Sequence, residues 1–151
     1  MAENADLIKL YSARILALAA DIPYHARLDA PQASVKRRSP LCGSTVTVDL
    51  DMQDGRVSRF GQDVKACALG QAAAAILGQA VIGRSASELA QARDELRAML
   101  TQDGPIPAAP FAGYEVLLPA REYRNRHASI LLALDAAAEA SAEAFAAAQA
   151  R

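Results

Sequence analysis

The clearest pattern of hydrophobic and polar positions lies in TVTVDLDM, residues 45–52, where the two kinds of residue alternate. The apolar positions are Val46, Val48, Leu50 and Met52. Such alternation is typical of a strand with one buried face. Asp54-Gly55 then supplies a turn dipeptide, and RVSRFGQDV follows as a second strand-like run. The two runs predict an antiparallel hairpin whose solvent face carries Asp49 and Asp51.

Helical patterns flank this hairpin on both sides. Residues Ala5 to Ala20 are amphipathic, and Asp21-Ile22-Pro23 ends that helix because proline disfavours helical geometry in the residue before it. After the hairpin, Cys67 to Val81 is rich in alanine, which predicts a helix that packs closely against a neighbour. Ser85 to Glu88 has the spacing of a capping box, which predicts a third helix to about Leu100.

Three further segments complete the predicted elements. Tyr24 to Pro40 is irregular, with a short edge strand around Ala33 to Arg37. A loop rich in glycine and proline follows the third helix, and the last helix begins near Arg126. This order predicts an α+β fold, in which a small antiparallel sheet of about three strands packs against several helices. A chain of 151 residues is expected to form a single domain, 1–151.

Composition narrows the functional classes. The formal net charge is -1, which gives no support for nucleic-acid binding through a general positive field. The start MAENADLIKL lacks the features of a secretory signal, so we expect a cytoplasmic protein in which a Cys42–Cys67 disulfide is disfavoured. Residues 66–83 carry no charge, but their alanine, glycine and glutamine content favours a buried helix over a membrane span.

The two cysteines bracket the predicted hairpin. Cys42 lies in the loop that enters its first strand, and Cys67 in the loop that leaves its second. Because an antiparallel hairpin returns the chain to its start, both should lie at the same end of the sheet. They are either small buried residues or two members of one site. His127, at the start of the last helix, is a candidate third member or an ordinary capping histidine, and His25 has a weaker claim.

Four stretches of the chain carry a resemblance to a known family. They are LYSARILALAADIP, PLCGSTVTVDLDMQDGRVSRF, KACALGQAAAAI and RHASILLALDA. Together they resemble the iron–sulfur cluster assembly scaffold family of the IscU/NifU/SufU type, over most of the chain. The separation of Cys67 and His127 is similar to that of the SufU-like branch.

The resemblance implies a scaffold or sulfur-acceptor protein rather than an enzyme. It implies that Cys42, Cys67 and His127 hold a transient [2Fe–2S] cluster or a zinc or iron ion. Thiolate and imidazole donors are suitable ligands for both a cluster and a metal ion. One of the cysteines would accept sulfur as a persulfide. The implied partners are a cysteine desulfurase and apo iron–sulfur proteins, with a homodimer as one arrangement, and neither nucleic acid nor membrane.

Two departures from the family pattern affect this reading. The family's Cys-Gly-Asp motif is Cys42-Gly43-Ser44 here, and His127 stands where the family has its third cysteine. Two thiolates and a histidine leave a fourth position of a metal open. The alternative is a degenerate scaffold fold that acts as an interaction or regulatory module without stable metal binding. A zinc hydrolase is disfavoured, since no glutamate adjoins the ligand segments to act as general base.

Two basic segments are further candidates for contact with an anionic partner. Lys36, Arg37 and Arg38 lead into the cysteine loop, and Arg121, Arg124 and Arg126 surround the start of the last helix. Both segments are also compatible with ordinary solvated surface.

Overall fold

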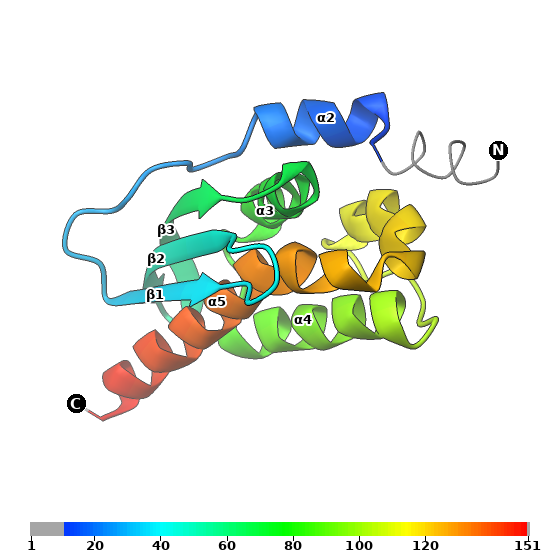
Figure 1. Ribbon diagram of the computed structural model, residues 1–151. Coiled ribbons are helices and arrows are strands. Elements are labelled where there is room, and N and C mark those ends of the chain that lie inside the picture. The colour runs from blue at the N-terminus through cyan, green and yellow to red at the C-terminus, as the bar shows by residue number, and fades with distance from the viewer. Residues whose placement is uncertain (1–10, 151) are drawn as a thin grey trace, which may run out of the picture.

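A computed structural model, which describes residues 11–150, contains one antiparallel sheet with strands in the order β1–β2–β3 (Figure 1). The strands span Ala33–Arg38, Thr45–Gln53 and Arg56–Lys65. Asp54 and Gly55 join β2 to β3 with φ angles of 53° and 76°, which a two-residue hairpin turn of type I′ requires at both positions. The predicted hairpin is confirmed, and the predicted edge strand pairs with β2 along its whole length.

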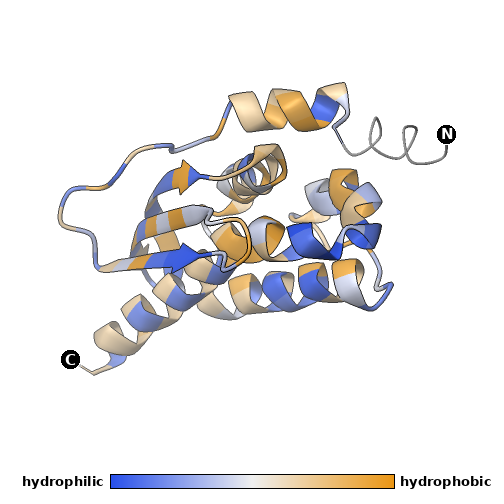
Figure 2. Ribbon diagram, viewed as in Figure 1, coloured by the Kyte–Doolittle hydropathy of each residue, from blue (hydrophilic) through white to orange (hydrophobic). Residues whose placement is uncertain are grey.

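One face of the sheet packs on the last helix, α5, which spans Arg124–Gln149. Strand residues of this inner face include Val46, Val48, Leu50, Phe60 and Val64, all buried. Figure 2 shows hydrophobic and hydrophilic residues alternating along the strands, as the sequence pattern predicts. Helix α5 also contacts α3 and α4, so it lies at the centre of the fold. It begins two residues earlier than expected, at Arg124.

The other face of the sheet is covered where the sequence predicts solvent. The segment that follows Pro23 crosses this face. It passes so close to β3 that a Cβ added to Gly61 would collide with the Ala26 carbonyl oxygen. Asp49, expected on a solvent face, therefore has a fully buried side chain. Asp51 is partly exposed. The prediction for Asp49 is wrong because strand alternation tells which residues share a face but not what covers that face.

The helices before and after the sheet pack on each other. Helix α2, Ala13–Ala20, lies against α3, Ala68–Ala80 (Figure 1). The part of the predicted first helix at residues 5–10 lies outside the described residues. An ideal Cβ on Gly78 would approach Pro23 to 3.0 Å, so the small residues of α3 allow close packing, as expected. No helix within residues 11–150 has the length and apolar content needed to cross a membrane.

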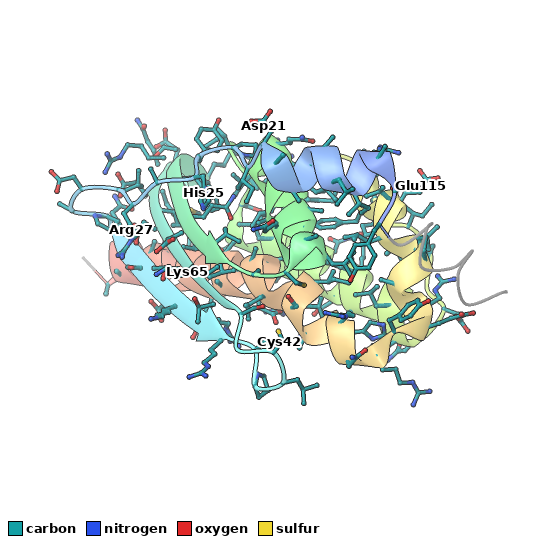
Figure 3. All side chains as sticks on the ribbon, turned by 45° about the horizontal axis from the view of Figure 1, so that its top comes forward. Asp21, His25, Arg27, Cys42, Lys65 and Glu115 are labelled. Carbon is teal, nitrogen blue, oxygen red and sulfur yellow. The ribbon has the colours of Figure 1, made fainter. Side chains whose placement is uncertain are left out.

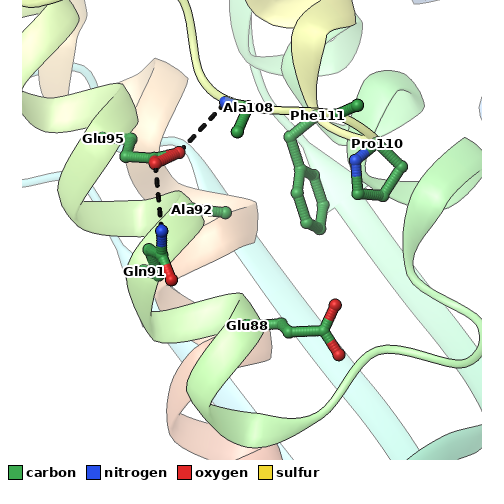
Figure 4. A pocket seen from close by; sticks show the side chains of 8 residues that line it. Glu88, Gln91, Ala92, Glu95, Ala108, Pro110 and Phe111 are labelled. Atoms are coloured by element: carbon green, nitrogen blue, oxygen red, sulfur yellow. Dashed lines mark hydrogen bonds between the residues drawn. The ribbon is translucent and has the colours of Figure 1, made fainter.

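The remaining elements enclose the far side of α5. Helix α4, Ala86–Thr101, begins with the predicted capping box between Ser85 and Glu88. A loop then leads to a 3-10 helix, η1, at Ala112–Glu122. A small pocket opens between α4 and this loop (Figure 4), where the Ala108 amide donates to Glu95 at 3.1 Å.

Candidate sulfur site

Cys42 lies on the short loop that joins β1 to β2. The Ser39 amide donates to the Ser44 carbonyl at 2.8 Å, and the Gly43 amide donates to the Ser39 carbonyl at 3.0 Å. Gly43 adopts φ +73°, a left-handed conformation that glycine adopts without steric cost. The loop holds Cys42 exposed at the edge of the molecule (Figure 3), beside Leu41, a residue that is 72% exposed.

Cys67 occupies a different environment, at the end of β3. It is the N-cap residue of α3, with extended backbone angles of φ −67° and ψ 170°, and its side chain makes no capping hydrogen bond. It is half-buried. Its sulfur lies beside the first amides of the helix, which carry a positive partial charge.

Two serine hydroxyls join the cysteine thiols. Cys42 Sγ lies 3.0 Å from Ser44 Oγ, and Cys67 Sγ lies 3.4 Å from Ser129 Oγ. Ser129 Oγ donates to Ser44 Oγ at 3.4 Å, which closes the chain. Both serines are buried, with exposed fractions of 6% and 2%. The structure thus brings the two cysteines to one end of the sheet, as the hairpin topology predicts, with two serines between them.

Close packing of α3 on α5 makes this arrangement possible. An ideal Cβ on Gly70 would lie 2.7 Å from Ser129 Oγ and 2.8 Å from the Ala66 Cβ. Contacts that short do not occur in folded proteins, so a side chain on Gly70 would displace its neighbours. The glycine in the first turn of α3 therefore allows Ser129 to approach Cys67.

Hydroxyl groups around Cys42 make its thiol unusually acidic. They lower the pKa of Cys42 from 9.0 to about 7, with Ser39 the largest influence, followed by the hydroxyl and amide of Ser44. Partial burial opposes the effect, and Ser129 adds a small contribution. Ser39 Oγ is buried and has no hydrogen-bond partner of good geometry within residues 11–150, so its proton is available to an anionic sulfur. A large share of Cys42 is therefore thiolate, the nucleophilic form, at neutral pH.

His127 is engaged elsewhere. Its Nε2 donates to the carbonyl oxygens of Ala120 at 2.9 Å and Arg121 at 3.1 Å, which ties the end of η1 to the start of α5. The residues that the structure describes include no group of three His, Cys, Asp or Glu side chains that could hold a metal ion. Residues two positions apart on a helix point to opposite sides. Ser129, not His127, consequently faces the cysteines.

The other residues considered as site candidates either lie away from the cysteines or make contacts that hold neighbouring segments together. His25 accepts a hydrogen bond from the Val64 amide at 3.3 Å, well away from Cys42 in Figure 3. Arg121 donates to the carbonyls of Met99 and Gly104, and so holds the loop after α4. The Lys36–Arg38 segment forms part of strand β1 rather than a loop.

Arg38 is the member of this basic segment that reaches the cysteine loop. Its Nη2 atom would lie 3.7 Å from a Cβ on Gly43. The Arg38 side chain therefore lies beside the loop that carries Cys42.

Sequence reasoning missed Ser129 and Ser39 as members of the site. The available signal for Ser129 was a polar residue inside the apolar run ASILLAL, residues 128–134. A buried hydroxyl in such a run needs a hydrogen-bond partner, and the partners here are a thiol and a second serine.

Comparison with known proteins decides the family. A crystal structure of the N-terminal part of a NifU-like nitrogen-fixation protein from Brucella abortus matches with a TM-score of 0.90 and 42% sequence identity. The match covers 93% of this chain and 98% of that one. The chain belongs to the IscU/NifU/SufU family. No family model matches this member of the family, and no curated protein matches it either.

Two more distant structures share the fold. One is described as a candidate iron–sulfur cluster assembly scaffold of the SUF system from Fervidobacterium islandicum AW-1, with a TM-score of 0.78 and 16% identity over 89% of this chain and 98% of that one. The other is described only as a hypothetical protein, with a TM-score of 0.76 and 22% identity over the same shares of both chains. The predicted α+β scaffold fold, with its three-stranded antiparallel sheet, is confirmed.

Proposed function

We propose that this protein accepts sulfur and acts as a scaffold in iron–sulfur cluster assembly. The observation that carries the proposal is the exposed Cys42 thiol, whose pKa is lowered to about 7, joined through two serines to a second cysteine. A structural cysteine would be buried and inert, whereas a sulfur acceptor must be both accessible and ionised. Membership of the family supports the same role.

The sulfur donor is proposed to be a cysteine desulfurase that carries a persulfide. The Cys42 thiolate attacks the outer sulfur of that persulfide and forms a new S–S bond. The bond between the two donor sulfurs breaks, and its electron pair leaves with the donor cysteine as a thiolate. Neither an oxidant nor a reductant is needed. Exposure of Cys42 on a narrow loop allows this sulfur to enter the donor's active site.

The cluster or metal ion is the cargo of the scaffold, and the proposed protein ligands are Cys42 and Cys67. A [2Fe–2S] cluster takes four protein ligands, and zinc also takes four donors. The described residues bring together two thiols and two serine hydroxyls, so this donor set alone does not complete either shell. His127 would have to give up its two carbonyl partners before it could become a third ligand. Its ligand role stays a prediction.

The sulfur-acceptor proposal is tested with a cysteine desulfurase and cysteine under anaerobic conditions. After alkylation, trypsin places Cys42 in the peptide of residues 39–56 and Cys67 in that of residues 66–84. Mass spectrometry then detects one added sulfur atom on each peptide separately. We expect added sulfur on wild-type protein and on Cys67→Ser, and none on Cys42→Ser. Wild-type protein without added sulfur on Cys42 would contradict the proposal and favour the interaction or regulatory module.

The ligand proposal has its own test, in which each variant is reconstituted with iron and sulfide. We expect Cys42→Ser and Cys67→Ser to lose bound iron, whereas His127→Gln retains it, because a glutamine amide can still donate to the η1 carbonyls. Circular dichroism confirms that each variant is folded. A folded His127→Gln variant that loses iron as completely as the cysteine variants would make His127 a ligand, as the family resemblance implies.

A further inference from the structure

The two thiols of the site differ in access and in what surrounds them. Cys42 is exposed on a loop, whereas Cys67 is half-buried at the N-terminus of α3. A donor protein can reach the first sulfur directly but meets the second only behind the loop. The hydroxyl chain through Ser44 and Ser129 nevertheless connects the two sulfurs.

We propose that Cys67 takes the outer sulfur atom of a Cys42 persulfide, so that sulfur moves from the exposed cysteine to the half-buried one. This inference rests on the proposed sulfur-acceptor function. Cys67 Sγ forms a bond to the outer sulfur, and the bond between that sulfur and Cys42 Sγ breaks. Its electron pair stays on Cys42 Sγ. The sulfane sulfur keeps its oxidation state, so the transfer requires no other redox partner.

The hydroxyl chain supplies the proton balance of this transfer. Ser129 Oγ has one hydrogen, which it donates to Ser44 Oγ. Cys67 must then be the donor in its 3.4 Å contact with Ser129 Oγ, and the Ser44 hydrogen is free to point at Cys42 Sγ, 3.0 Å away. All hydrogens therefore point from Cys67 toward Cys42. A proton that leaves Cys67 as it attacks can move along this chain to the Cys42 thiolate.

The direction of transfer follows from the leaving group and from the destination. Ser44 Oγ lies 3.0 Å from Cys42 Sγ, where its hydrogen can stabilise the negative charge that the leaving sulfur acquires. At Cys67, the first amides of α3 favour an anionic persulfide. Partial burial there also limits attack by other thiols. Sulfur is thus received at an accessible position and held at a protected one.

The loop must move for the transfer, because serines lie between the sulfurs. A persulfide places its outer sulfur about 2 Å beyond Cys42 Sγ, which shortens the gap. Pro40, Leu41, Cys42 and Gly43 carry no paired strand backbone, since the β1–β2 pairing ends at Arg38 and Thr45. Movement of this loop therefore leaves the β1–β2 pairing intact.

The experiment uses glutathione persulfide as donor, with anaerobic quenching by alkylation at successive times. Added sulfur is followed separately on the peptides of residues 39–56 and 66–84. In the wild type we expect it first on Cys42 and later on Cys67, with the Cys42 signal falling as the Cys67 signal rises. In Cys67→Ser it stays on Cys42. In Cys42→Ser it reaches Cys67 at least about tenfold more slowly.

Serine variants test the connecting chain. Ser129→Ala removes the contact to Cys67, and we expect the second step to slow by about tenfold or more, with a much smaller effect on the loading of Cys42. Ser141→Ala is the matched control, because Ser141 is also buried on α5 but donates to the Ala138 carbonyl of its own helix. We expect wild-type kinetics from this variant.

Three results would overturn the transfer while leaving the acceptor function intact. They are Cys42 labelled with Cys67 never labelled, Cys67 labelled as fast in Cys42→Ser as in the wild type, and a Cys42–Cys67 disulfide with release of hydrosulfide. The last result would mean that Cys67 attacks the inner sulfur instead. Failure to label Cys42 at all would overturn the acceptor function together with the transfer.

Discussion

Within residues 11–150, the polar network around Asp49 on the covered face of the sheet differs from the one between the cysteines. The Asp49 carboxylate accepts from Arg27 at 2.6 Å, from Ser34 at 2.6 Å and from the Leu28 amide at 3.0 Å. These are short, charge-assisted bonds. The cysteine network is built from contacts of 3.0 to 3.4 Å between thiols and hydroxyls, and it ends at an exposed sulfur.

The difference between the networks corresponds to a difference in role. The Asp49 network has its bonds filled by the chain itself, so it attaches the segment around Arg27 and Leu28 to β2 and leaves no group free to react. The cysteine network retains an ionisable thiol at the surface and the buried Ser39 hydroxyl, which has no hydrogen-bond partner of good geometry within residues 11–150. Strong closed networks stabilise a fold, whereas weak open ones leave a nucleophile available.

The largest expected effect comes from breaking the Asp49 network. Asp49→Ala leaves the Leu28 amide and the Ser34 hydroxyl without their acceptor, and we expect the free energy of unfolding to fall by about 2 kcal/mol. Denaturant unfolding measures the change. Asp63→Ala, on the same face of the neighbouring strand but partly exposed, is the control and should change stability much less. Equal effects would show that the network does not hold the segment.

The contribution of the Asp49 network to the free energy of unfolding depends on pH. Burial acts to raise the pKa of Asp49, but hydrogen bonds from Arg27, Ser34 and Leu28 outweigh it, so the pKa lies below its ordinary 3.8. The stabilisation is therefore complete above pH 3.8 and is lost as pH falls through the lower folded-state value. The stability difference between wild type and Asp49→Ala should shrink only in that acidic range.

A smaller effect on stability is expected from the helix contact behind the cysteines. Gly70→Ala places a Cβ 2.7 Å from Ser129 Oγ. Overpacking opposes the better helix propensity of alanine, and we expect a net loss of about 1 kcal/mol with faster alkylation of Cys67. Gly113→Ala is the control, because its Cβ would meet Ile76 at an acceptable 3.4 Å. Unchanged Cys67 reactivity in Gly70→Ala would contradict the role given to this contact.

The smallest expected effect comes from substitutions of Ser44, which should change the pKa of Cys42. Ser44→Ala removes a hydrogen-bond donor to the thiolate, and Ser44→Asp adds a carboxylate that repels it. Both should raise the pKa of Cys42 from about 7, the aspartate variant by about one unit or more. The rate of alkylation against pH, measured in a Cys67→Ser background, gives the midpoint. A midpoint that stays near 7 in both variants would remove Ser44 from the explanation.

The sequence predicted the local elements well because their signals are local. Alternation gave β2, Asp54-Gly55 gave the hairpin turn, and the Ser85–Glu88 capping box gave the start of α4. The hairpin also made it possible to predict that two cysteines distant in the chain meet at one end of the sheet. Each of these inferences depends on hydrogen bonds or side-chain periods within a few residues.

The sequence did not predict which residue of α5 lies next to the cysteines. Near the start of α5, the direction in which the helix packs decides whether His127 or Ser129 meets the cysteines. A histidine is the more conspicuous candidate, but its contacts with the η1 carbonyls turn it away. Asp49 is likewise covered by a segment that lies more than twenty residues earlier in the chain.

The sequence by itself thus determined the order of elements, the hairpin and the position of Cys42 and Cys67 at one end of the sheet. These features follow from backbone geometry over short distances. Only the tertiary structure decided that two serines connect the thiols, that the His127 ring donates to the η1 carbonyls and that Asp49 is buried. The physical reason is that the rotation of a packed helix and the path of a covering segment depend on contacts between residues remote in the chain.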